Sequence, residues 1–155
     1  MPRVVLFEPE IPPNTGNVAR TCAAMATELH LVEPLGFELS DRTLRRAALD
    51  YWPYVQLQRH HSWNGFCNAR HGLGGRLIGL TSRGGETYHQ HRFDPSDWLL
   101  FGRETTGLPK DVKAECDNLL TVPMLQPGVR CLNLASAVAI VLSEALRQLQ
   151  NPLHD

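Results

Sequence analysis

The chain has 155 residues, and its 15 Lys+Arg against 16 Asp+Glu leave a formal net charge of −1. This length fits one domain over residues 1–155 with a sizeable core. The near-neutral balance excludes a bulk electrostatic attraction to nucleic acid or membrane. All the cations except Lys110 and Lys113 are arginines, whose planar, forked donors suit phosphate and carboxylate. A codon bias would explain the same excess.

Four cysteines occur without paired or zinc-type spacing, and the chain opens directly into a strand-like run without a secretory signal. Such cysteines are typical of reduced thiols, so we expect a cytoplasmic protein.

Short apolar runs alternate with helical patterns along the whole chain. Strands are predicted at Arg3–Phe7, Leu29–Val32, Arg76–Thr81, Trp98–Phe101 and Leu119–Val122, and helices at Asn17–Ala26, Asp41–Leu49, Ser62–Ala69, Pro109–Ala114 and Leu132–Gln150. Strands that are apolar on both faces favour a parallel sheet covered on both sides. We therefore expect an α/β fold with an open, mostly parallel sheet of five or six strands and helices on both faces.

The first predicted helix follows a Pro- and Asn-rich segment. Asn14 or Thr15 is expected to cap a helix that starts near Gly16. Asn17 and Arg20 are three residues apart and share one face near the positive end of that helix, where a phosphate or ribose would be well placed. A well-capped helix without a binding role explains the segment equally well.

Two positively charged segments follow, one in the helix over residues 41–49 with Arg42, Arg45 and Arg46, and the other at 59–61. Such segments are usually solvated, and a nucleic-acid contact is the alternative interpretation. The histidines near Tyr88–His91 lack further ligands at useful spacing, so no metal site is predicted. A phosphate-binding loop motif is absent.

Three predicted strands end in loops of unusual composition, at residues 82–85, 102–109 and 123–128. In open α/β sheets ligands bind beyond the carboxyl ends of the strands, and glycine lets the backbone approach a ligand closely. The three loops are therefore expected to line one pocket, largely with backbone groups.

The last predicted helix is apolar nearly all round from Leu134 to Leu142, apart from Ser136. A helix that packs on one face would show polar residues opposite, and this apolar run is too short to span a bilayer. We expect the core to cover one side and a second subunit to cover the other, which places a site at a subunit interface.

Three sequence blocks resemble the SPOUT class of RNA methyltransferases, and within it the TrmL (YibK-like) tRNA ribose methyltransferases. The blocks are Glu8–Asn17 with Arg20, Phe101–Pro109, and Val122–Met124 through Arg130–Leu134 into the last helix. Residues 41–51 also look like the family, and the resemblance covers about Val4 to Leu149.

The resemblance implies a trefoil knot near the C-terminus, although knots are very rare in proteins. It also implies a homodimer, S-adenosyl-L-methionine as cofactor, and methyl transfer to the ribose 2′-hydroxyl of the wobble cytidine or uridine (position 34) in the anticodon stem-loop of tRNA. No membrane or metal partner is implied.

By position, the resemblance implies a cofactor slot at Leu80, Gly102, Val122, Met124, Cys131 and Leu132. Arg20 is the catalytic candidate and would reach the cofactor of the partner subunit. A guanidinium keeps its proton at neutral pH and is therefore a poor general base, so Arg20 is interpreted as holding the phosphate and stabilising the developing alkoxide. Asn17, Arg20, Arg45, Arg46 and Asn133 are the implied substrate contacts. Glu104 either braces its own loop or faces the cofactor's ammonium.

The chain departs from its relatives at Cys131, Ala135 and Ser143, where they typically carry serine, serine and tyrosine. A non-catalytic tRNA-binding module of the same fold, a 2′-O-methyltransferase of another RNA and a generic flavodoxin-like domain are the alternatives. The last leaves residues 17–20 and the apolar final helix unexplained.

Overall fold

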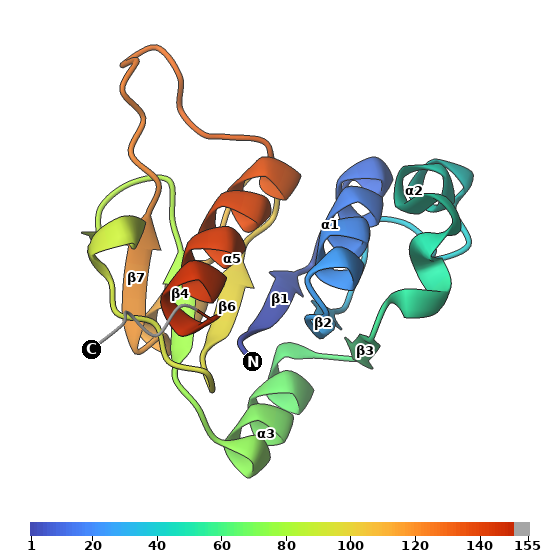
Figure 1. The fold of residues 1–155 in the computed structure, drawn as a ribbon, viewed down its shortest axis with the longest axis horizontal. Coiled ribbons are helices and arrows are strands. Elements are labelled where there is room, and N and C mark those ends of the chain that lie inside the picture. The colour runs from blue at the N-terminus through green and yellow to red at the C-terminus, as the bar shows by residue number, and fades with distance from the viewer. Residues whose placement is uncertain (151–155) are drawn as a thin grey trace.

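The computed structural model describes residues 1–150, in which seven strands form one parallel sheet with the order β3-β2-β1-β6-β4-β7-β5 (Figure 1). The strands are β1 (Arg3–Phe7), β2 (Leu29–Val32), β3 (Leu57–His60), β4 (Leu77–Leu80), β5 (Glu86–Thr87), β6 (Trp98–Phe101) and β7 (Asn118–Thr121). The helices are α1 (Pro12–Ala24), α2 (Arg42–Ala48), α3 (Trp63–Leu73), α4 (Lys110–Ala114) and α5 (Leu134–Gln150), with the short 3₁₀ helices η1 (Leu49–Tyr54) and η2 (Tyr88–Gln90). None of these helices is long and apolar enough to cross a membrane.

The α/β class, the parallel pairing and every predicted helix are confirmed, but the predicted count of five or six strands is too low. The additional strands are β3 and β5. β3 has the sequence LQRH, and β5 has only two residues. Both lie at the edges of the sheet, where little burial is required and the apolar pattern that identifies a strand is weak.

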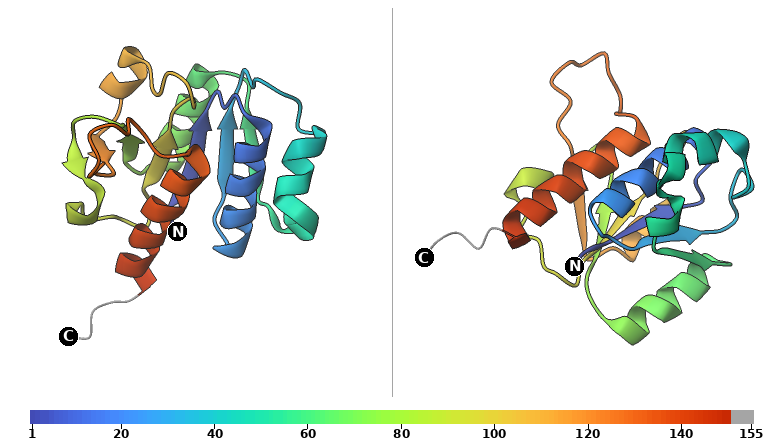
Figure 2. Two further views of the ribbon diagram at one scale, coloured as in Figure 1. Left: turned by 90° about the horizontal axis from the view of Figure 1, so that it is seen from above. Right: turned by 45° about the vertical axis from the view of Figure 1, so that its right-hand side comes forward.

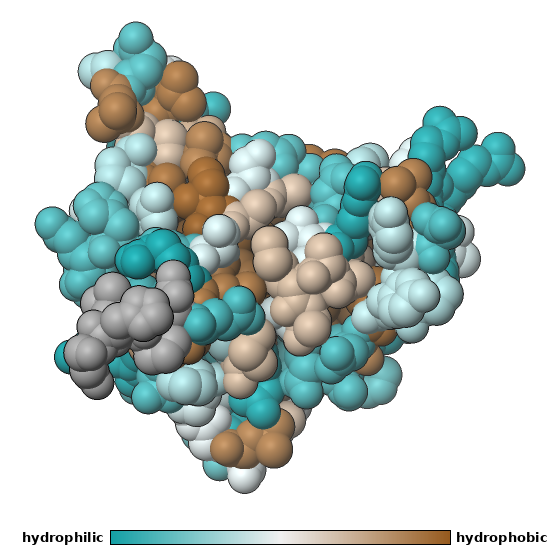
Figure 3. All heavy atoms as spheres, viewed as in Figure 1, coloured by the Kyte–Doolittle hydropathy of each residue, from teal (hydrophilic) through white to brown (hydrophobic). Residues whose placement is uncertain are grey.

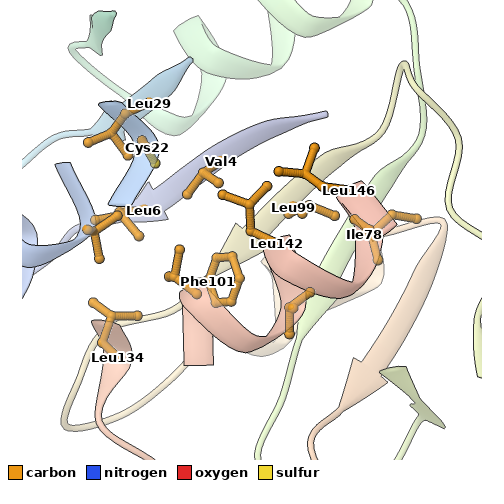
Figure 4. Packing of buried hydrophobic residues seen from close by; sticks show 14 of the residues in the cluster. Val4, Leu6, Cys22, Leu29, Ile78, Leu99, Phe101, Leu134, Leu142 and Leu146 are labelled. Carbon is orange, nitrogen blue, oxygen red and sulfur yellow. The ribbon is translucent and has the colours of Figure 1, made fainter. Parts of the chain in front are cut away.

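Two hydrophobic clusters cover the two faces of the sheet. On one face α1 and α5 pack on β1, β2, β4 and β6, and on the other α3 and α4 pack on the opposite side chains of the central strands (Figure 2). Leu142 and Leu146 of α5 point toward Ile78 and Leu99 of the sheet, as Figure 4 shows. Alternation of side chains along each strand supplies both clusters.

The carboxyl ends of the four central strands lie at one edge of the sheet because all their pairings are parallel. Leu6 is opposite Phe101, and Gly79 is opposite both Leu100 and Leu119. The segments that follow β1, β4, β6 and β7 therefore leave the sheet at the same edge. One of them, between β7 and α5, extends well away from the sheet (Figure 1).

Helix α1 begins at Pro12, not near Gly16 or Asn17, so the predicted start and caps are wrong. Ile11 is the N-cap residue and makes no side-chain cap, and two prolines fill the first positions. Proline is accepted there because those positions need no N–H partner. The earlier start places Arg20 in the third turn, beyond the reach of the helix N-terminal charge, which acts over the first turn.

Candidate active site

A pocket of about 570 Å³ lies at the carboxyl edge of the sheet. The loops after β4, β6 and β7 form most of its wall, together with the start of α5 and Lys113 of α4. Its lining residues are Leu80, Thr81, Ser82, Arg83, Phe101, Gly102, Arg103, Glu104, Thr105, Thr106, Gly107, Leu108, Lys113, Val122, Met124, Arg130, Cys131, Leu132, Leu134 and Ala137. The structure thus brings the three loops singled out in the sequence together around one cavity.

All six residues predicted for the cofactor slot line this pocket: Leu80, Gly102, Val122, Met124, Cys131 and Leu132. The apolar members come from the strand ends and from the chain entering α5. The loop over residues 102–107 contributes backbone groups and folds back on itself through a pair of hydrogen bonds between Arg103 and Gly107. An apolar slot bordered by backbone donors and acceptors is the usual form of a small-molecule site.

Gly102 is required by this loop itself. A Cβ atom at Gly102 would lie 2.3 Å from the carbonyl carbon of Gly107 and 2.4 Å from the amide nitrogen of Leu108. Both are backbone atoms, so neither can move aside without opening the turn. From the sequence, this glycine was explained by a close approach of the backbone to a ligand. In the structure, the backbone that lies close to Gly102 is that of Gly107 and Leu108, and this turn shapes the pocket wall.

Glu104 joins the pocket to helix α1. Its carboxylate accepts hydrogen bonds from the backbone N–H of Glu10, at 3.1 and 3.2 Å, and from that of Ile11 at 2.6 Å. In return, the Glu10 carboxylate accepts from the N–H and hydroxyl of Thr105, at 3.1 and 2.8 Å. A third connection is the ion pair between Arg103 and Glu8. Of the two roles considered for Glu104, the contacts assign the bracing one.

The anion at the N-terminus of α1 is thus a carboxylate of the chain. Burial raises the pKa of Glu104, and the backbone donors of Glu10 and Ile11 act in the opposite direction. The hydrogen bonds to Thr105 lower the pKa of Glu10. The two carboxylates hold the β1–α1 and β6–α4 connections together across more than 90 residues of sequence.

Arg20 and Asn17 are exposed on α1 and are not among the pocket residues of their own chain. The guanidinium of Arg20 lies over the ring of Tyr51 in η1, 5.5 Å from the ring centroid. Asn14, in contrast, points inward and is 8% exposed. It does not cap α1.

Asn133 connects the start of α5 to α1. Its amide nitrogen donates to the side-chain oxygen of Asn14 at 2.9 Å. Its own side-chain oxygen accepts from the N–H groups of Ala135 and Ser136, at 2.9 and 3.4 Å. Asn133 therefore caps α5, and this helix start needs no hydroxyl at residue 135.

The predicted RNA-contacting arginines differ in their surroundings. Arg45 lies over Trp52, 4.1 Å from the ring centroid, and donates to the carbonyl of Leu39, so it braces α2. Arg46 is exposed and has no side-chain hydrogen bond or ion pair within residues 1–150. The second basic segment is neutralised, because Arg59 and His61 both pair with Glu33.

Several residues of the site were missed by sequence reasoning. Glu8, Glu10 and Thr105 were read only as parts of a block, and Lys113 was unassigned. Their pairing depends on the adjacency of β1 and β6 in the sheet, which no local pattern encodes. Within residues 1–150 no group of three His, Cys, Asp or Glu side chains is arranged to hold a metal ion.

The comparisons with known proteins agree on one family. A family model described as SpoU rRNA Methylase family matches residues 1–143. The tRNA (cytidine(34)-2′-O)-methyltransferase of Burkholderia ambifaria is 48% identical over 146 residues, which cover 94% of each chain. A solved structure from work on the 2-OH methylation of C/U34 on tRNA is 48% identical with a TM-score of 0.93, covering 97% of both chains.

A second solved structure is the SpoU methyltransferase AviRb of Streptomyces viridochromogenes in complex with AdoMet. It is 25% identical with a TM-score of 0.86, and the match covers 97% of this chain and 61% of AviRb. A family match over most of the length and near-complete superposition on a 48% identical structure lead to one conclusion: the chain belongs to the SpoU rRNA methylase family.

Proposed function

We propose that this protein is an S-adenosylmethionine-dependent 2′-O-methyltransferase of the wobble cytidine or uridine of tRNA. The observation that carries the proposal is the pocket formed by the three strand-end loops, which gathers all six positions implied for the cofactor. A relative that is 48% identical over nearly the whole chain is a tRNA (cytidine(34)-2′-O)-methyltransferase. A solved structure of the same identity comes from work on the 2-OH methylation of C/U34 on tRNA. Family membership supports methyl transfer to RNA, and these relatives support tRNA as the RNA.

The residues of the pocket fit S-adenosylmethionine. Its volume of about 570 Å³ is in the range of small-molecule sites. Leu80, Val122 and Leu132 offer apolar walls for adenine and the methionine chain, the backbone of residues 102–107 offers polar groups, and Lys113 offers a cation to a carboxylate. When bound, S-adenosylmethionine supplies a methyl group activated by its sulfonium.

We propose Arg20 as the catalytic residue, acting on the pocket of a partner subunit. Its exposure and its position outside its own chain's pocket support this arrangement. A guanidinium remains protonated at neutral pH, so Arg20 holds the phosphate beside the target ribose and stabilises the developing 2′-alkoxide. Asn17 lies on the same helix as a ribose contact, and Arg46 contributes a further phosphate contact. Arg45 and Asn133 would act mainly through the helices they brace.

A homodimer through α5 would bring Arg20 to the second pocket. Ala135, Ala139 and Ile140 of α5 stay partly exposed on the single chain, and Met25 beyond α1 is 37% exposed. In Figure 3 weakly hydrophobic residues gather over α5 and α1 between hydrophilic margins. An isologous dimer would bury this surface and so remove the exposed apolar side of α5 from water. We further propose that residues 1–155 act as one methyltransferase domain with the trefoil knot of SPOUT proteins, in the cytoplasm.

The departures from the relatives leave this proposal intact. Cys131 lines the pocket, and a contact made through its backbone is insensitive to the exchange of a hydroxyl for a thiol. Asn133 replaces the capping that Ala135 lacks. Ser143 is exposed on α5 and leaves room at the dimer surface where relatives carry a larger ring.

The first experiment is the transfer of labelled methyl from S-adenosylmethionine to tRNA that lacks the wobble modification, followed by identification of the product nucleoside. A 2′-O-methylated cytidine or uridine at position 34 is the expected product. Labelling of a different RNA only would favour another substrate class. Cofactor binding without labelling of any RNA would favour the non-catalytic module.

A mixing experiment tests Arg20 across the dimer. Arg20→Ala and a pocket variant, Gly102→Val, should each lose methyl transfer, and Arg20→Ala should bind S-adenosylmethionine normally. In a heterodimer the intact pocket of the Arg20→Ala subunit faces the intact Arg20 of the Gly102→Val subunit, and the other site lacks both groups. About half of the dimers in a randomly exchanged mixture are heterodimers, so the mixture should recover about a quarter of wild-type activity. An active Arg20→Ala enzyme, or a mixture without recovery, would refute catalysis from the partner subunit.

A further inference from the structure

Two tyrosines of η1 are exposed beside the helix that carries Arg20. Tyr51 is 42% exposed and Tyr54 is 70% exposed. Large aromatic side chains contribute strongly to binding when they become covered, and they lose little conformational entropy when they do. The pocket does not include either tyrosine, so the cofactor site leaves them unexplained.

The 3₁₀ geometry of η1 attaches both tyrosine side chains on one side of the helix. Side chains at positions i and i+3 of a 3₁₀ helix eclipse each other, with a rise of about 2 Å per residue. Tyr51 and Tyr54 are three residues apart within η1, so their attachment points are separated by about 6 Å along the helix axis. Aromatic bases stack at about half that spacing, so such a pair can hold one base between the rings or stack two on their outer faces.

The backbone of η1 is anchored, and its tyrosines are therefore presented from a firm support. Trp52, between them in sequence, packs against the main core and is covered by the guanidinium of Arg45 at 4.1 Å. Pro53 restricts the backbone of the same turn. A base that binds here would meet two rings that project from a backbone whose position is already set.

The charge around the tyrosines matches a nucleic acid. Arg20 lies over the ring of Tyr51, and Arg42 and Arg46 are exposed on α2, which leads directly into η1. Exposed aromatic rings combined with arginines are the common solution for binding unpaired nucleotides, where bases stack and cations track the phosphates. Within residues 1–150 none of these three arginines makes an ion pair, and they outnumber Asp50, the one acidic residue of η1.

We propose that Tyr51 and Tyr54 form a stacking surface for unpaired bases of the RNA loop that carries the target nucleotide. Tyr51 is also a positioning residue, because its ring holds the guanidinium of Arg20. This inference rests on the proposed function and names the structural element of the substrate that the enzyme recognises. It explains how this domain selects a loop over a duplex, because paired bases present no free faces.

The test compares Tyr51→Leu/Tyr54→Leu with Tyr51→Phe/Tyr54→Phe. The leucine pair removes the rings and the phenylalanine pair keeps them without the hydroxyls. Dissociation constants for an unmodified anticodon stem-loop are measured by fluorescence anisotropy at several salt concentrations, alongside kcat and KM for methyl transfer. A fully paired hairpin stem serves as the reference RNA, and Leu73→Ala, at an exposed residue of α3, serves as the control for loss of an exposed apolar side chain.

The leucine pair should raise the Kd for the stem-loop by about tenfold or more for each lost stack, with a salt slope lowered by at most about 1, because Arg20 is the one phosphate-holding group that Tyr51 supports. The Kd for the paired stem and S-adenosylmethionine binding should not change. The phenylalanine pair should restore loop binding to within about twofold, since stacking depends on the ring face. Tyr51→Leu alone should also lower kcat, because Arg20 loses its support.

Stem-loop binding by the leucine pair at the wild-type Kd would overturn the proposal and would assign the tyrosines to another partner. An equal loss of loop and stem binding, or a loss of cofactor binding, would also overturn it, because both point to general damage. Wild-type methyl transfer to tRNA in the same assay separates these results from a failure of the proposed function, in which the unaltered protein would transfer no methyl.

Discussion

Replacement of Glu104 tests whether the pocket and helix α1 are held together by one carboxylate. Glu104→Ala removes three contacts to the backbone N–H groups of Glu10 and Ile11. Loss of a helix N-cap costs about 1 kcal/mol, within a range of roughly 0.5–2 kcal/mol. Hydrogen bonds to a charged group contribute more, about 1.5–3 kcal/mol when buried. Because Ile11 is exposed and water can replace part of the loss, we expect about 1–2 kcal/mol.

In a domain of this length each kcal/mol lowers Tm by roughly 2–4 °C, so Glu104→Ala should melt about 2–8 °C below the wild type. Glu104→Gln should lose less than half of that, because the amide keeps an acceptor and avoids the burial of charge that raises the pKa of Glu104. Differential scanning calorimetry measures both variants.

At temperatures where Glu104→Ala is fully folded, its rate of methyl transfer should still be lower than that of the wild type. The reason is that α1 carries Arg20, and a helix start released from the pocket loop misplaces that guanidinium. Methyl transfer at 25 °C measures this effect. A Glu104→Ala protein with a Tm within about 1 °C of the wild type and unreduced kcat would refute the bracing role.

Two further outcomes follow from the geometry. Gly102→Ala should abolish S-adenosylmethionine binding in isothermal titration calorimetry, because the added Cβ would lie 2.3 Å from backbone. Gly107 has a positive φ but open space around it, so Gly107→Ala should keep binding and cost only about 1–2 kcal/mol of stability. An equal loss of cofactor binding in the two variants would contradict the steric account. Burial lowers the pKa of His30, which lies between His60 and Glu28 with Arg3 nearby. Below about pH 6.5 the unfolded chain therefore takes up a proton that the native His30 resists, and stability falls as the pH falls. Urea unfolding at pH 7.5 and 5.5 should show this loss, and His30→Gln should reduce it; an unchanged pH dependence in that variant would refute the assignment.

The sequence predicted the pocket well because its signals are local. Each lining loop follows an apolar strand, and parallel strands deliver their carboxyl ends to one edge, so the loops at residues 82–85, 102–109 and 123–128 could be placed around one pocket without knowing the strand order. The individual cofactor positions came from the family resemblance: Leu80, Gly102, Val122, Met124, Cys131 and Leu132. For Gly102, the reason for a glycine required the structure, since the clashing atoms belong to the same loop.

The start of α1 was predicted wrongly for a physical reason. Sequence reasoning looked for a cap among Asn14 and Thr15, whereas the stabilising carboxylate is that of Glu104, 93 residues away from Ile11. The cap residues proposed for α1 instead point inward, Asn14 toward Asn133. Edge strand β3 was missed because three of its four residues, Gln58, Arg59 and His60, are polar and consecutive, as in a loop. Contacts of this kind appear only when the order of the strands is known.

The long reach of the contacts at Asn133 and Glu104 has a consequence for synthesis. A ribosome releases the chain from its N-terminus, and domains fold as their parts emerge. The pocket, however, takes part of its wall from residues up to Ala137, and Asn133 joins the start of α5 to Asn14 of α1 across 119 residues. A nascent chain therefore has its sheet before it has a site, and any stabilisation by a ligand reaches only the finished molecule. Cofactor supply can protect the completed enzyme from unfolding, but it cannot assist the chain while it is being made.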